Sequence, residues 1–153
     1  MASFKFDGID YISASLEQLS NISDAEKMNI IRPAAEFLRT KYQEVLGKRF
    51  VRRSGDLADS ISIEERSDEN GVYAHIFPKG KHRGSSTGKR KRRNGRSNGR
   101  YSGTNAEVAY ILNYGSPRIA ATHWLENAND EASEEIVAIQ QERWDDLITQ
   151  KGL

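Results

Sequence analysis

Histidines and adjacent carboxylates are the residues of this chain from which catalysis could be expected. None of the three histidines, His75, His82 and His123, has another histidine or an acid at a metal-ligand spacing. Glu64 and Glu65 are neighbours, so in a strand their carboxylates would point to opposite faces. We therefore expect no catalytic residues, no metal site and no cofactor, and a protein that is not an enzyme. A metal-dependent nuclease stays open as an alternative.

The segment 79–103 concentrates positive charge. It contains ten Lys or Arg residues and no acid, whereas the whole chain has 23 bases and 22 acids. Without this segment the chain would have 13 bases against 22 acids, so a nearly neutral protein is basic in one place and acidic elsewhere. The basic residues are Lys79, Lys81, Arg83, Lys89, Arg90, Lys91, Arg92, Arg93, Arg96 and Arg100.

Three interpretations of this basic segment stay open. Closely spaced Lys and Arg release counterions from nucleic acid, so the segment could contact phosphates without a fixed fold. It could instead dock on an acidic protein surface, or be a solvated insertion. Tyr101 is its single aromatic residue, so we expect neither base stacking nor sequence-specific readout. Its Gly and Ser content predicts a loop, and deletion of Gly80 to Ser102 should leave the fold intact.

The overall composition predicts one domain, residues 1–153, with the basic loop 79–103 inserted in it. Apolar residues make up 37% and charged residues 29% of the chain, so we expect a modest core and burial between subunits. The absence of cysteine excludes disulfides and thiolate catalysis. No apolar run approaches the ~20 residues that cross a bilayer, and the N-terminus lacks a signal-peptide core, so we expect a soluble protein.

The N-terminal quarter predicts short elements before a longer helix. Residues 4–6 are expected to form a strand, and apolar residues at helical spacing over 9–19 predict a brief amphipathic helix. Ser23 and Glu26 have the spacing of a capping box, in which each side chain accepts a hydrogen bond from the other residue's backbone N–H. A new helix should therefore begin here.

Apolar residues recur at helical spacing from Met28 to Leu46, and this stripe predicts the core face of that helix. Pro33 lies inside the stripe and has no N–H, so the helix either kinks near 29–31 or gives way to a second helix with proline in its first turn. We expect Gly47 to end it.

The middle of the chain alternates apolar and polar residues. The runs 61–63 and 72–76 flank Asn70 and Gly71, and Asn-Gly readily adopts the positive φ angles of a tight turn, so a β-hairpin is predicted. Alternation over 106–114 favours a third strand, although so short a pattern leaves a helix open. The basic loop would then connect two strands.

A long amphipathic helix is predicted from His123 to about Thr149, with Thr122 as its N-cap. It is long enough to cover a small sheet. Trp144 fits its apolar stripe and is expected in the core, whereas Trp124 is either a core residue, which we favour, or an anchor of a subunit contact. The predicted fold class is α+β: a small antiparallel sheet packed against the long C-terminal helix and N-terminal helices.

Three short motifs occur in order along the chain. The first has Ser54, Gly55, Leu57, Ser60 and Ile61; the second has Ala109, Tyr110, Asn113, Gly115 and Ser116; the third has Trp124, Leu125, Asn127 and Ala128. In order and spacing they resemble motifs of the head-to-tail joining or tail-completion proteins of long-tailed bacteriophages, over residues 10 to 145.

That family has TG-x-L-x-x-S-I before the hairpin, Y-A-x-x-V-E-x-G-T after it, and P-x-x-F-L-x-P-A at the start of the last helix. This chain departs from the pattern at several positions: Ser54 and Ser116 each stand in place of Thr, Ala109 and Tyr110 are in reversed order, Asn113 replaces Glu, and Asn127 replaces proline.

The resemblance implies a non-enzymatic virion subunit. Such a subunit would assemble in the host cytoplasm into a homo-oligomeric ring, a hexamer or a dodecamer, at the phage neck or tail end. It would join connector and tail proteins while DNA passes through the lumen, with no membrane partner. The candidates for subunit contact are Tyr114, Pro117, Arg118 and Trp124. The basic loop is longer than the family's usual loop, so the resemblance assigns it no role.

The alternative function belongs to a different class. In it, the chain is a free-standing nucleic-acid-binding protein that contacts DNA nonspecifically through residues 79–100.

Overall fold

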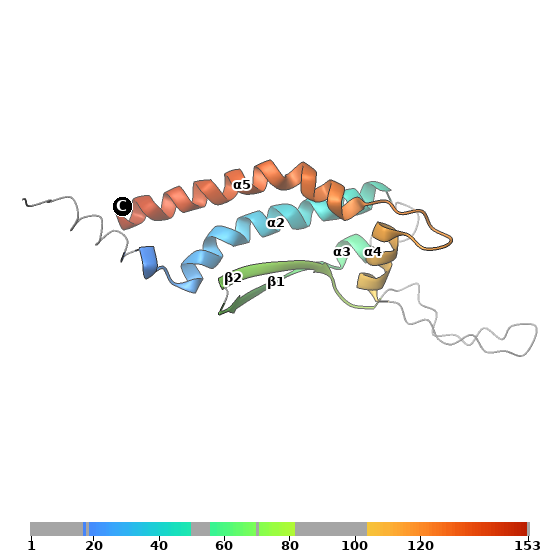
Figure 1. Cartoon of the computed structure of the whole chain (residues 1–153), viewed down its shortest axis with the longest axis horizontal. Helices are drawn as coiled ribbons and strands as arrows, with labels where there is room; N and C mark the ends of the chain where they lie inside the picture. Colours follow the sequence, from blue (N-terminus) through green and yellow to red (C-terminus); the bar gives the residue numbers. More distant parts are fainter. Residues whose placement is uncertain (1–16, 18, 50–55, 70, 82–103, 153) are drawn as a thin grey trace, which may run out of the picture.

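The structure is a computed structural model that describes residues 17, 19–49, 56–69, 71–81 and 104–152 (Figure 1). The strand expected at 4–6 and most of the helix expected at 9–19 lie outside these residues. The described elements form helices and a two-stranded antiparallel sheet, which is the α+β class expected from the sequence. In chain order they are α2 (Asp24–Arg49), α3 (Asp56–Asp59), β1 (Ile61–Asp68), β2 (Gly71–Pro78), α4 (Asn105–Tyr114) and α5 (Trp124–Lys151).

The predicted capping box begins α2. The backbone N–H of Ser23 donates to Glu26 Oε2 at 2.8 Å, and the N–H of Glu26 donates to Ser23 Oγ at 3.3 Å. The helix then continues through Pro33 for 26 residues, so the alternative of a second helix starting at the proline is wrong. It also runs past Gly47 to Arg49, because one glycine inside a helix weakens it without requiring its end.

The predicted hairpin is confirmed. β1 and β2 pair antiparallel from Ile61 opposite Pro78 to Asp68 opposite Gly71. Gly71 has a φ of +130°, a conformation that side chains other than glycine rarely adopt. The hairpin therefore turns where the Asn-Gly signal placed it.

The strand predicted for 106–114 is wrong, because this segment is helix α4. Thr104 and Glu107 form a second capping box, in which Glu107 N–H donates to Thr104 Oγ1 at 3.2 Å and Thr104 N–H donates to Glu107 Oε2 at 2.8 Å. Asn105, Ala109 and Asn113 are buried, and this spacing of four residues follows one face of a helix. The basic segment thus connects a strand to a helix.

The elements lie in layers, with α2 between α5 and the hairpin (Figure 1). α5 has 28 residues and so spans about 42 Å at ~1.5 Å per residue. It packs along α2, where Ala128 and Ala132 have no exposed surface, and the hairpin packs mainly against the other side of α2. The long helix therefore supports the sheet chiefly through α2.

The main core cluster lies where the end of α2 meets α3, α4 and the start of α5. It gathers side chains from five elements, so it fixes the junction between the hairpin and the helices. Its buried members are Tyr42, Leu46, Leu57, Ile61, Ala109, Trp124 and Ala128.

Candidate partner-binding surfaces

The two ends of the basic segment are held together. Lys81 and Thr104 form an antiparallel bridge, the N–H of Asn105 donates to Gly80 O at 3.0 Å, and the Asn105 side-chain amide donates to Lys79 O at 2.9 Å. We call these residues, 79–81 and 104–105, the stem. The stem places the two ends of the basic segment beside each other. The segment is therefore an insertion at one point of the fold.

Only the first two predicted basic site residues lie in the described part of the chain. Lys79 and Lys81 are exposed beside the start of α4. The N–H of Lys79 donates to Ser60 O at 2.8 Å, which ties the stem to β1. The other predicted basic site residues lie outside the described residues: Arg83, Lys89, Arg90, Lys91, Arg92, Arg93, Arg96 and Arg100.

The three sequence motifs meet in the core cluster. Leu57 and Ile61 come from the first motif, Ala109 from the second, and Trp124 and Ala128 from the third. Motif positions separated by tens of residues therefore pack together in one place. Ser54 and Gly55 of the first motif lie outside the described residues.

Trp124 is a core residue. It is 3% exposed, its indole N–H donates to Ala109 O at 3.2 Å, and its ring meets the Tyr42 ring edge-on at 5.5 Å between centroids. The Tyr42 hydroxyl donates to Asn129 Oδ1 at 2.5 Å, while burial raises the pKa of Tyr42. Trp124 is thus not accessible for the subunit contact that was its alternative role.

The start of α5 is capped by a side chain from α4. Thr122, the predicted N-cap, instead donates its hydroxyl to Leu112 O at 2.7 Å, and His123 occupies the N-cap position with a φ of 48° and no side-chain capping bond. Asn113 supplies the missing acceptor: its Oδ1 accepts from the N–H of Leu125 at 2.9 Å, and its amide donates to Glu126 Oε1 at 3.0 Å. Asn113 is 2% exposed, and its two side-chain hydrogen bonds join α4 to the first turn of α5.

The loop between α4 and α5 is tight. Gly115 has a φ of +83°, and a Cβ at this position would come within 2.8 Å of the backbone nitrogen of Ala121, so only glycine fits here. Ser116 and Ile119 exchange backbone hydrogen bonds of 2.8 and 3.1 Å. The predicted contact residues Pro117 and Arg118 lie in the turn between them and are exposed.

An aromatic surface lies beside this loop. Tyr110 and Tyr114 are 63% and 53% exposed, and their rings contact each other with centroids 4.7 Å apart. Ile119, in the turn that follows, is 45% exposed. We call Tyr110 and Tyr114 the tyrosine surface. It includes Tyr114, a predicted contact residue, and it adds Tyr110, which sequence reasoning did not select.

A groove lies between α2 and α5, near the turn of the hairpin. It has a volume of about 510 Å³. Its lining is mainly apolar, from Ile30, Ile31, Val72, Val137 and Trp144, with Lys27, Gln140 and Gln141 as its polar members. Val137 is 61% and Trp144 37% exposed. The prediction that Trp144 is a core residue is therefore wrong, because the apolar stripe of α5 is wider than the face that α2 covers. We call this feature the α2/α5 groove.

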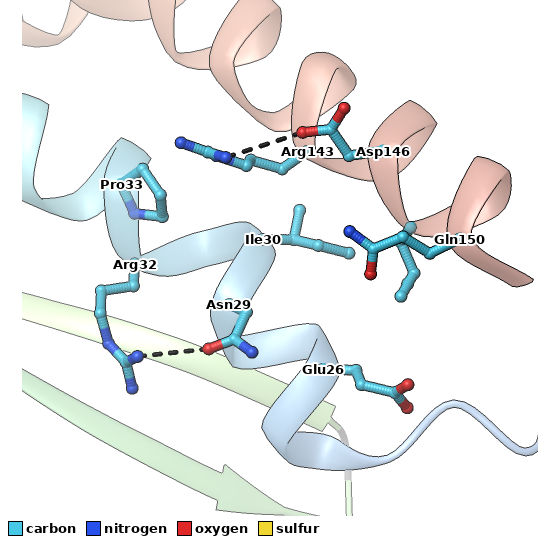
Figure 2. A pocket seen from close by; sticks show the side chains of 9 residues that line it. Glu26, Asn29, Ile30, Arg32, Pro33, Arg143, Asp146 and Gln150 are labelled. Atoms are coloured by element: carbon cyan, nitrogen blue, oxygen red, sulfur yellow. Dashed lines mark hydrogen bonds and ion pairs between the residues drawn. The ribbon is translucent and has the colours of Figure 1, made fainter.

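Figure 2 shows a second pocket between the same helices, of about 400 Å³. Its charged side chains are paired: Arg143 Nη1 lies 3.6 Å from Asp146 Oδ2, and Glu26 Oε1 lies 2.8 Å from Lys151 Nζ. Arg32 donates to Asn29 Oδ1 at 3.3 Å and, away from the pocket, to both carboxylate oxygens of Glu65 at 2.7 and 2.9 Å. The Glu26–Lys151 pair joins α2 to α5, and the Arg32–Glu65 pair joins α2 to β1.

The residues considered for catalysis are separated in the structure. His75 lies against the Tyr73 ring at 5.0 Å between centroids, and His123 is at the start of α5, while His82 lies outside the described residues. Glu64 contacts Arg66 at 3.0 Å, and Glu65 contacts Arg32. Across the described ranges, no group of three His, Cys, Asp or Glu residues could hold a metal ion.

No family model matches the chain, and comparisons with curated proteins and with solved structures likewise give no match. Among the helices of the described part of the chain, none is long and apolar enough to cross a membrane.

Proposed function

We propose that this chain is a structural subunit of the neck or tail end of a long-tailed bacteriophage. Copies of it form a ring that joins the tail to the head connector, and DNA passes through the opening. The subunit acts by assembly and has no catalytic role. The virion is its place of action, and connector and tail proteins are its neighbours.

The convergence of the three motifs is the observation that carries this proposal. Their order and spacing resemble the tail-completion family, and Leu57, Ala109 and Trp124, one from each motif, pack in the same core cluster. Packing in one cluster gives these motif residues a common structural role. The proposal rests on the resemblance of these motifs, and the function of the family is proposed with it.

The surface of the molecule agrees with a role in assembly. Tyr110, Tyr114, Val137 and Trp144 are large apolar side chains in contact with solvent. Exposed apolar patches on small proteins mark sites of association with other proteins. A subunit with a small core can gain part of its stability from such contacts.

Electron microscopy tests the proposal. The purified protein, examined by negative stain, should form closed rings with a central opening, and antibodies against it should label the junction of head and tail on phage particles. Label elsewhere on the particle, or none on particles of a phage that encodes the chain, would contradict a neck or tail-end location.

A second candidate function is nonspecific binding of nucleic acid. It is favoured by the stem, where exposed Lys79 and Lys81 begin a segment with ten bases and no acid. Duplex DNA should then bind to a monomer with micromolar affinity that falls steeply between 50 and 200 mM salt, on the order of 10³-fold for six phosphate contacts. Weak binding with little salt dependence would count against this candidate.

A further inference from the structure

The tyrosine surface and the α2/α5 groove are apolar areas of different shape. Tyr110 and Tyr114 stand out from one side of a helix and pack on each other. The groove is an open hollow of about 510 Å³ between α2 and α5. A projecting aromatic pair and an apolar hollow are complementary in shape.

The charges around the two areas are also complementary. Lys79 and Lys81 are exposed beside the first residues of α4, and Arg118 is exposed just beyond its last residue. Glu107, three residues before Tyr110, is also exposed, and its carboxylate accepts from the N–H of Thr104 in the capping box. The three bases therefore leave an excess of positive charge around α4.

Acids outnumber bases around the groove. Lys27, which lines it, is paired with Asp24 at 3.3 Å. Glu134 and Asp130 precede Val137 by three and seven residues on α5, so they continue its row on the helix surface, and Asp145 follows Trp144 directly. All three acids are exposed. Opposite charges next to matching apolar areas favour one partner orientation over others.

The two areas lie in different parts of the molecule. α4 is near one end of the long axis, whereas the groove lies along the half of α5 that leads to the C-terminus (Figure 1). A contact between two different surfaces of identical subunits leaves one of each free on every dimer, so copies continue to add; they form a ring when the rotation between neighbours closes and an open filament when it does not.

We propose that the tyrosine surface of one copy docks into the α2/α5 groove of the next copy. This rests on the proposed ring function and identifies the surfaces that build the ring. Tyr110 and Tyr114 enter the groove against Val137 and Trp144. Lys79, Lys81 and Arg118 then face the acids of α5.

Two variants, each with one surface altered, test this contact. The tyrosine variant carries Tyr110→Ser and Tyr114→Ser. The groove variant carries Val137→Arg, which adds a positive charge in the groove, where it would repel the basic side chains that border the tyrosine surface of the next copy. These side chains are more than half exposed, so both variants should fold. Ala138→Arg is the matched control, because it adds the same charge to the neighbouring exposed position of α5.

Sedimentation velocity gives the result. The unaltered protein and Ala138→Arg should form the same closed oligomer, and each surface variant alone should sediment as a monomer of about 17.3 kDa. An equal mixture of the two variants should form a dimer and stop, because each variant keeps the surface that the other has lost. Circular dichroism checks folding, and Gln141→Arg, also in the groove, is a second groove variant.

The contradicting outcomes are distinct. If both variants form rings like the unaltered protein, this contact is wrong and the ring function stands. If each variant is a folded monomer and their mixture stays monomeric, a contact between these two surfaces is wrong. If the unaltered protein is a monomer at every concentration, both this contact and the proposed ring function fail.

Discussion

The two ends of the α2/α5 pair are held together in different ways. Where α2 ends and α5 begins, Tyr42, Leu46, Trp124 and Ala128 are buried in one cluster. Where α2 begins and α5 ends, the ion pair between Glu26 and Lys151 joins the two helices across 2.8 Å. Apolar burial is insensitive to pH, whereas an ion pair needs both charges, so the two ends should respond differently to mutation and acid.

Removing Trp124 should have the largest effect. Trp124→Ala leaves a cavity beside Tyr42 and removes the donor to Ala109 O, so unfolding free energy should fall by about 3–5 kcal/mol. Chemical denaturation measures the loss. Trp144→Ala is the matched control at the partly exposed tryptophan of the same helix and should cost much less. Equal losses would contradict the placement of these two side chains.

Removing the remote cap should have the next largest effect. Asn113→Ala leaves the N–H of Leu125 and one carboxylate oxygen of Glu126 without their partner, so it should destabilise the protein by about 1–3 kcal/mol. Hydrogen exchange should show the loss in the first turn of α5. Asn127→Ala, which removes only a 3.5 Å bond to Thr122 O, is the control. An unchanged exchange rate at Leu125 in Asn113→Ala would contradict the capping role.

Acid should loosen the ion-paired end first. Hydrogen bonds from the Lys151 ammonium, and then from the backbone and hydroxyl of Ser23, lower the pKa of Glu26 to about 2 from its ordinary 4.5. The folded pKa lies below the unfolded one, so this contribution is complete above pH 4.5 and is lost as the pH falls towards 2. Intrinsic amide exchange itself slows as the pH falls, so the quantity to follow is the protection factor, the ratio of the intrinsic to the observed exchange rate. Protection factors in the last turn of α5 should fall over that interval, before those near Trp124 do.

Glu26→Gln tests the origin of this acid response. The variant should have lower protection factors in the last turn of α5 at neutral pH, and these should fall less between pH 4.5 and 2. Glu131→Gln makes the same charge change at an exposed position of α5 and should behave like the unaltered protein. A response to acid that persists in Glu26→Gln would assign the effect to other groups.

Shortening the basic segment should have the smallest effect on either end. Replacing residues 82–103 by Asn-Gly joins Lys81 to Thr104 through a two-residue turn, which suits an antiparallel pair. The free energy of unfolding should change by less than about 1 kcal/mol, since the stem bonds of Gly80 and Asn105 are retained. Thermal unfolding measures it. Loss of a cooperative transition would mean that the fold depends on the segment.

Local signals in the sequence predicted the elements that depend on neighbouring residues. Ser23 and Glu26 located the start of α2, Asn-Gly located the hairpin, and the long apolar stripe located α5. The same capping pattern occurs at Thr104 and Glu107, and it would have identified α4 as a helix. Alternation over 106–114 was misleading because α4 buries Asn105, Ala109 and Asn113, two of which are polar and do not count in an apolar pattern.

The candidate surfaces depend on contacts between distant parts of the chain, and these could not be read from local patterns. The stripe of α5 does not say how much of its width α2 covers, so Trp144 was assigned to the core. Asn113 caps a helix that begins 11 residues later, and no local rule predicts such a pair. Tyr110 was placed in a strand, where its stacking on Tyr114, four residues along a helix, could not be anticipated.

The stem is a site at which segments of different length and sequence should be tolerated. Because Lys81 and Thr104 are already adjacent, whatever joins them closes a loop whose ends are fixed, and doubling the length of an unstructured loop costs only about 0.6 kcal/mol. Related chains could therefore carry very different segments here on an unchanged subunit. The same position would accept a tag or a small domain, with both ends of the insert held by the stem.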